Sequence, residues 1–131
     1  MQKQFSHAAS IFPVPDPMEA AKYYEENLGF EIFFAWGDPP EYVVTNREDA
    51  VGIHFVKQED DYKPSKSHVT LYIFVNDVDL LYQELKKKPV KIINPIGTRE
   101  WGMRDFDIID PNDYIICFAT SVDRLSGNKD S

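Results

Sequence analysis

The chain repeats one order of secondary-structure signals twice, and this repetition limits its possible folds more than any other feature. Asp16 stands before a proline and a helical pattern, and Asp77 stands before a second helical pattern 61 residues later (77 − 16 = 61). Aspartate suits such a position because its carboxylate accepts hydrogen bonds from the free amides of a first helical turn. In both passes one strand pattern precedes the helix and three follow it. The sequence therefore predicts an α+β fold of two tandem βαβββ modules.

The expected elements follow from the spacing of the apolar residues. In the first module we expect a helix from Asp16 to a stop at Gly29, and strands at about 10–14, 30–36, 41–46 and 50–57. In the second module we expect a helix from Asp77 to Pro89, and strands at about 68–75, 90–95, 103–109 and 113–119. We expect one domain over residues 1–131, with module one at about 7–57, a polar linker at about 58–67, module two at about 68–120 and a polar tail at 121–131.

Composition narrows the possible partners. A net charge of −8 and an isoelectric point near 4.8 argue against nucleic-acid binding, which requires basic surface to neutralise phosphate. No apolar run approaches the roughly 20 residues that span a membrane, and the N-terminus lacks the basic and apolar regions of a signal peptide. The single cysteine, Cys117, cannot form an intrachain disulfide. We therefore expect a cytoplasmic protein without a nucleic-acid or membrane partner.

Three segments resemble the glyoxalase / bleomycin-resistance / dioxygenase superfamily, whose fold is called the vicinal oxygen chelate fold. They are residues 16–30 (Asp-Pro-Met-Glu-Ala-Ala-Lys-Tyr-Tyr-Glu-Glu-Asn-Leu-Gly-Phe), residues 75–82 (Val-Asn-Asp-Val-Asp-Leu-Leu-Tyr), and the closing hairpin at 100–118 with its Trp-Gly, Asp-Phe and Asp-Pro pairs. The resemblance covers about residues 7–120. It implies that each module curls a mixed sheet into half of a cleft and that two copies form a homodimer. It implies no single activity, because the superfamily hosts isomerases, dioxygenases, thiol transferases and binding proteins.

Metal enzymes of this superfamily carry one ligand on the first strand and one on the last strand of each module. The matching positions in this chain are Ala9, Ile53, Thr70 and Cys117. A divalent ion needs at least three converging N, O or S donors, so this set predicts no metal cofactor. The alternative is a metal-dependent glyoxalase- or dioxygenase-like enzyme, in which His7 and His68 act as displaced ligands.

Two further residues carry reactive groups but receive no catalytic role. His54 neighbours Ile53, and strand residues alternate between faces, so we expect His54 to point away from the cleft. Cys117 lies in the apolar run Ile-Ile-Cys-Phe, where burial disfavours a thiolate. We therefore expect no catalytic residue and no nucleophilic cysteine.

Aromatic residues offer a different way to hold a ligand. The residues expected to line the cleft are Trp36, Trp101, Phe55, Tyr42 and Tyr72. Both tryptophans stand beside a glycine near a strand end, where an indole can offer a flat face to a planar or cationic molecule. Asp38 and Glu100 lie close to the tryptophans and can attract a cation.

These features predict a metal-independent small-molecule binding protein of the bleomycin-resistance type. The resemblance implies that such a protein sequesters an aromatic or cationic ligand, an antibiotic in the resistance proteins, without chemistry. A third hypothesis is an interaction module whose cleft is filled by its own side chains.

Overall fold

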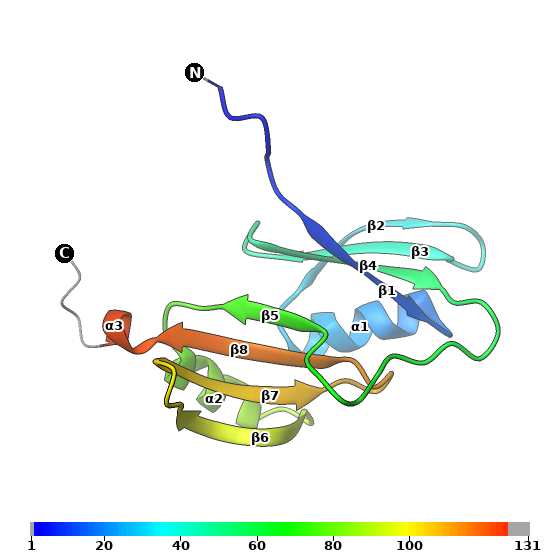
Figure 1. Cartoon of the computed structure of the whole chain (residues 1–131). Helices are drawn as coiled ribbons and strands as arrows, with labels where there is room; N and C mark the ends of the chain where they lie inside the picture. Colours follow the sequence, from blue (N-terminus) through cyan, green and yellow to red (C-terminus); the bar gives the residue numbers. More distant parts are fainter. Residues whose placement is uncertain (1, 126–131) are drawn as a thin grey trace. The chain divides into compact units, whose positions relative to one another are not determined.

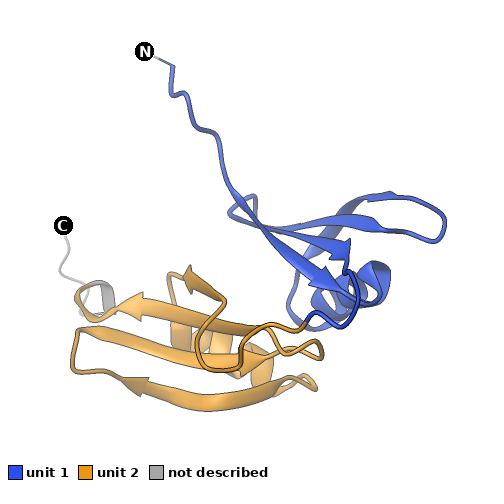
Figure 2. Cartoon of the chain, turned by 45° about the vertical axis from the view of Figure 1, so that its right-hand side comes forward, with its two compact units in different colours: residues 1–62 blue, residues 63–131 orange. Residues whose placement is uncertain are grey.

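The computed structural model describes residues 2–125. The chain divides into two compact units, unit 1 (residues 1–62) and unit 2 (residues 63–131), which Figure 2 colours separately. Each unit is built on one four-stranded sheet. Within the described residues, none of the helices has the length and apolar character needed to cross a membrane.

Unit 1 is a βαβββ module (Figure 1). Its elements are β1 (Ala9–Val14), α1 (Pro17–Asn27), β2 (Glu31–Trp36), β3 (Tyr42–Arg47) and β4 (Val51–Lys57). The strand order in the sheet is β1-β4-β3-β2. β1 runs parallel to β4, and the other neighbours are antiparallel.

Unit 2 repeats this arrangement. Its elements are β5 (Leu71–Phe74), α2 (Val78–Lys86), β6 (Lys91–Thr98), β7 (Met103–Ile109), β8 (Ile115–Ser121) and the short α3 (Val122–Leu125). The strand order is β5-β8-β7-β6, with β5 parallel to β8. Both sheets are therefore mixed and share one topology, which confirms the predicted α+β fold of two βαβββ modules.

Both predicted helix caps are present. The Asp16 carboxylate accepts a hydrogen bond from the Glu19 amide at 3.1 Å, and the Asp77 carboxylate accepts one from the Leu80 amide at 3.1 Å. Gly29 follows α1 with a φ of +73°, a backbone conformation that side chains other than glycine rarely adopt. The chain can therefore turn sharply after α1 and enter β2.

The structure differs from the sequence prediction at two strand ends. β5 begins at Leu71 instead of 68, because β5 pairs only with β8. The Thr70 amide still donates to the Ile115 carbonyl at 2.7 Å, but β8 begins at that residue and offers no strand partner further upstream. At the other end, β8 continues to Ser121 and α3 follows it, so part of the expected polar tail is ordered in secondary structure.

In unit 1, α1 covers one face of the sheet through a cluster of rings. Tyr24 of α1 lies 6.4 Å from Phe12 of β1 and 5.0 Å from Phe55 of β4, centroid to centroid. Phe55 has 0% of its surface exposed. Phe55, which was expected to line a ligand site, therefore lies in the core beneath the helix.

In unit 2, α2 packs in the same way. Tyr82 of α2 lies 4.8 Å from Phe106 of β7, and Phe106 lies 5.3 Å from Phe118 of β8. Val78 and Leu85 of the same helix are fully buried. The predicted apolar stripe of this helix thus faces the sheet, and burial of such side chains stabilises the unit.

Candidate functional site

Each sheet has a second face that carries no helix of its own unit, called here the helix-free face. In β4 the buried Ile53 and Phe55 lie on the side of α1, and His54 between them lies on the helix-free face. The structure thus places Ile53, the residue expected at the metal-ligand position, beneath α1, and it places His54 on the opposite face. Because β4 has apolar residues on both faces, its pattern alone does not reveal which face the helix covers.

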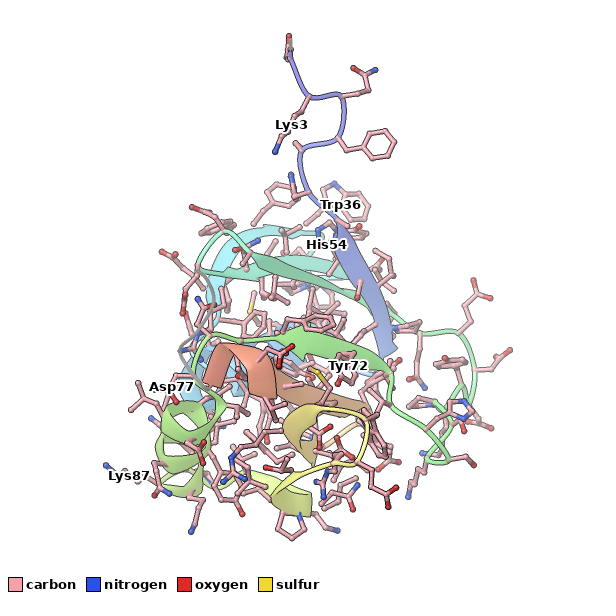
Figure 3. The ribbon with its side chains drawn as sticks, turned by 60° about the vertical axis from the view of Figure 1, so that its left-hand side comes forward. Lys3, Trp36, His54, Tyr72, Asp77 and Lys87 are labelled. Atoms are coloured by element: carbon pink, nitrogen blue, oxygen red, sulfur yellow. The ribbon has the colours of Figure 1, made fainter. Side chains whose placement is uncertain are left out.

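The helix-free face of unit 1 is mainly apolar. Ile11 of β1 lies opposite His54, and His54 lies opposite Val44 of β3. Further along the sheet, Trp36 of β2 lies opposite Tyr42 of β3. Figure 3 shows Trp36 and His54 on the side of the sheet that lies away from α1. When the second face of a sheet meets only water, that face normally carries polar residues. The helix-free face of unit 1 does not follow this pattern.

Trp36 presents the largest ring on this face. It is 61% exposed, and Phe34, which pairs with Val44 on the same face, is also exposed. The Glu41 amide donates to the Trp36 carbonyl at 2.8 Å and closes the turn after β2. Asp38 is exposed in this turn. The structure therefore brings Trp36, Asp38 and Tyr42 together on one strand pair and its connecting turn.

Tyr42 and His54 form a polar pair within this apolar face. The Tyr42 Oη and His54 Nδ1 atoms are 2.7 Å apart, and the two ring centroids are 5.5 Å apart at an interplanar angle of 67°. The hydrogen bond joins two neighbouring strands and holds the Tyr42 ring in place beside Trp36. The sequence indicated Tyr42 as a site residue but not His54. The pattern that could have indicated His54 is a polar residue between two buried apolar residues of one strand.

The helix-free face of unit 2 is built on the same strand order but has different chemistry. Tyr72 of β5 lies opposite Cys117 of β8, and Cys117 lies opposite Asp107 of β7. Asp107 accepts a hydrogen bond from the Asn94 side chain at 2.5 Å. Tyr72 is 40% exposed, and this predicted site residue lies in the same row as the cysteine. This face therefore carries carboxylate and amide groups where unit 1 carries apolar side chains.

An ion pair and a buried thiol complete this second face. Arg99 Nε donates to Asp105 Oδ1 at 2.7 Å, and Asp105 is buried. Burial, and then a hydrogen bond to Asp107, raises the pKa of the Cys117 thiol well above its ordinary range. Burial also raises the pKa of Tyr72, with further contributions from the nearby Cys117 and the two aspartates. Both groups are therefore neutral at physiological pH, and Cys117 is not a thiolate nucleophile.

Trp101 and Glu100 lie in the turn between β6 and β7. Trp101 is 72% exposed, and Glu100 is exposed beside it. The Arg99 amide donates to the Met103 carbonyl at 2.7 Å and closes the turn. These two predicted site residues thus lie on a turn, whereas Tyr72 lies within a strand of the sheet.

The residues of the metal-ligand positions do not fit a divalent ion. By register, His54 of unit 1 corresponds to Cys117 of unit 2, because their partners Ile11 and Tyr72 are separated by the module offset (72 − 11 = 61). His54 Nδ1 is engaged by a tyrosine hydroxyl, and burial raises the pKa of the Cys117 thiol, which disfavours the thiolate that a metal ion binds. Residues 2–125 contain no group of three or more His, Cys, Asp and Glu side chains able to hold a metal ion.

His7 and His68, the two ligands of the alternative metal-enzyme hypothesis, lie outside the strands of the two sheets. His7 is exposed ahead of β1, where its Nδ1 lies 2.8 Å from the Ser6 hydroxyl. His68 is exposed ahead of β5. Neither histidine belongs to a group of metal-binding side chains in the described part of the chain.

Comparisons with known proteins agree with this fold. The model of the Glyoxalase/Bleomycin resistance protein/Dioxygenase superfamily matches residues 4–118. No curated protein matches the chain. Crystal structures with the same fold include TioX from Micromonospora sp. ML1, with a TM-score of 0.74 and 16% identity over 89% of this chain and 99% of that one.

Two further structures are similar to the same degree. A member of the superfamily from Alicyclobacillus acidocaldarius has a TM-score of 0.76 and 19% identity, over 95% of this chain and 98% of that one. TnmS3, described as an antibiotic binding protein from Streptomyces sp. CB03234, has a TM-score of 0.72 and 22% identity, over 92% of this chain and 99% of that one. At these identities the similarity shows the fold and not a shared ligand.

Proposed function

Because the chain belongs to the glyoxalase/bleomycin resistance protein/dioxygenase superfamily, we propose that it is a small-molecule binding protein that works without a metal ion. Its ligand is a planar aromatic molecule, with or without a positive charge, that stacks on the helix-free face of unit 1. The observation that carries this proposal is the exposed Trp36 indole beside Tyr42 and Phe34, on a sheet face built mainly of apolar side chains.

The physical basis is stacking supported by charge. An aromatic ring that covers Trp36 removes apolar surface from water and gains the geometry-dependent attraction between rings. Asp38 and Glu41 are exposed in and beside the turn that follows Trp36, and the chain carries a net charge of −8. Negative groups near an exposed ring favour a cationic ligand, which the ring face also attracts.

The proposal includes three finer points. The protein acts as a homodimer, as the family resemblance implies. Its ligand is an antibiotic-like molecule, a role for which TnmS3 is the relevant relative among proteins of this fold. It acts in the cytoplasm by sequestration, so no product forms. The remaining predicted residues, Tyr72, Trp101 and Glu100, belong to unit 2 and stay proposed ligand contacts of that unit by itself.

Titration calorimetry against a panel of planar cations tests the proposal, with bleomycin, ethidium and N-methylacridinium as probes. The chain contains two tryptophans, so the Trp101→Phe variant leaves Trp36 as its single indole. We expect saturable heat and quenching of Trp36 fluorescence in this variant. We also expect binding to persist after treatment with EDTA, because no metal ion takes part.

The control and the opposing result are both simple. Leu80→Ala removes an exposed apolar side chain from α2 of unit 2, which has no part in the proposed site, and should bind like the wild type. Absence of heat from every probe, at a protein concentration roughly 100 times a micromolar Kd, would overturn the proposal. Binding that disappears with EDTA and returns with added nickel or zinc would favour the metal-dependent enzyme instead.

A further inference from the structure

The hydrogen-bonded pair of Tyr42 and His54 is the polar feature at the centre of unit 1's helix-free face. Around it the sheet presents aliphatic or aromatic side chains, from Ile11 and Val44 beside His54 to Trp36 beside Tyr42. A polar pair in such surroundings has a strong effect on selectivity, because a ligand that covers it must either satisfy its hydrogen-bonding groups or leave them unpaired.

The two nitrogens of His54 differ in their surroundings. Nδ1 lies 2.7 Å from Tyr42 Oη. Nε2 makes no hydrogen bond to any described residue. In residues 2–125, Asn46 Oδ1 is the one buried side-chain nitrogen or oxygen atom without a partner, so Nε2 is not a buried atom. Nε2 therefore has solvent access and can bond to a ligand.

The tyrosine decides which role Nε2 plays. A phenol hydroxyl readily donates its proton, and a short contact to an imidazole nitrogen suits that direction. When Tyr42 donates to Nδ1, the neutral imidazole carries its proton on Nε2, because the hydrogen bond at one ring nitrogen sets the state of the other. Nε2 is then a donor that is available to an acceptor from outside the chain.

We propose that His54 Nε2 donates a hydrogen bond to a carbonyl oxygen or ring nitrogen of the bound molecule, with Tyr42 as the positioning residue that holds the required tautomer. This inference rests on the proposed function and names its ligand class: planar aromatic molecules that carry a hydrogen-bond acceptor at their edge. Trp36 supplies stacking, and His54 selects among the molecules that stack.

Two probes of equal size test the selection. One is N-methylacridinium with an acetyl group, and the other is N-methylacridinium with an isopropyl group, so that only the first has an acceptor. We expect the wild type to bind the acetyl probe about tenfold more tightly, the factor that one neutral hydrogen bond supplies. His54→Phe should abolish this preference and retain the affinity for the isopropyl probe.

The tyrosine is tested separately. Tyr42→Phe keeps the ring and removes the hydroxyl, so the preference for the acetyl probe should fall by several fold while the isopropyl probe binds as before. The ¹⁵N chemical shifts of the His54 ring should report a proton on Nε2 in the wild type and a mixture of tautomers in Tyr42→Phe. Matched controls are His68→Phe and Tyr62→Phe, which change exposed residues outside the sheet.

The outcomes separate the two proposals. If neither probe binds the wild type, the proposed function fails. If both bind but His54→Phe keeps the preference for the acetyl probe, or if the ¹⁵N shifts place the proton on Nδ1, the role of His54 fails alone. Failure of His54→Phe to fold leaves the wild-type shifts and the Tyr42→Phe affinities to decide the matter.

Discussion

Units 1 and 2 have one topology, but their helix-free faces have opposite chemistry. Ile11 and His54 occupy in unit 1 the positions that Tyr72 and Cys117 occupy in unit 2. Next to them, the first face carries Val44, whereas the second carries Asp107. The residues under the helices are mainly apolar in both units, so the core maintains the topology while the other face is free to change. In such a duplicated fold the helix-free faces, and not the topology, therefore determine what each unit can bind.

The largest expected effect tests the likeness of the two cores. Phe55→Ala removes a fully buried ring from the cluster with Phe12 and Tyr24, and Phe106→Ala removes the ring between Tyr82 and Phe118. We expect each to lower the free energy of unfolding by about 3–5 kcal/mol, measured by urea denaturation. A loss below about 1 kcal/mol in only one of them would show that the two helix-covered faces are not equivalent.

The two helix caps should behave alike, with a smaller effect. Asp16→Ala and Asp77→Ala each remove a carboxylate that accepts a first-turn amide at 3.1 Å. We expect a loss of about 1 kcal/mol in each case, again from urea denaturation. Asp16→Asn and Asp77→Asn are the matched controls, because asparagine also caps helices and should restore most of the stability.

An ion pair on α2 has no counterpart in unit 1. Asp79 accepts two hydrogen bonds from Arg104, at 2.8 and 2.9 Å, whereas the corresponding position of α1 is Met18 (79 − 61 = 18). The hydrogen bond from Arg104 lowers the pKa of Asp79 in the folded state. Its contribution is therefore complete above the pKa of the unfolded chain and is lost as pH falls through the lower folded value.

We expect Asp79→Asn to lose less than about 1 kcal/mol at neutral pH, because the pair is partly exposed. The difference from the wild type should shrink as the pH is lowered, and thermal unfolding over a pH series measures it. Asp61→Asn changes an exposed carboxylate in the linker and provides the control. A difference that grows toward acid pH would contradict the assigned direction of the shift.

The smallest effect on stability is expected at the tryptophans. Trp36→Ala and Trp101→Ala change exposed rings, so each should alter the free energy of unfolding by no more than about 0.5 kcal/mol. Binding of the planar cations should nevertheless weaken more in Trp36→Ala, because Trp36 lies on the helix-free face and Trp101 lies on a turn. Equal losses in calorimetric titrations would contradict the placement of the ligand on the helix-free face of unit 1.

The accuracy of the sequence prediction followed the distance over which each signal acts. Caps, helix stripes and the order of strands are local, and Asp16, Asp77 and the stripe that begins at Val78 were assigned correctly. The burial of Phe55 is not local, because its apolar side chain suits either phase of β4. The face on which His54 lies depends on the same choice of phase, and the pairing of Asp107 with Cys117 depends on the register between β7 and β8.

The sequence by itself determined that two βαβββ modules would form, because aspartate caps and apolar spacing act within a few residues of each other. Only the tertiary structure decided which face of each strand the helix covers, and therefore which side chains meet a ligand. That choice depends on contacts such as Tyr24 with Phe55, which join residues far apart in the chain. Strand alternation defines two faces, and packing alone determines which of them remains free of the helix.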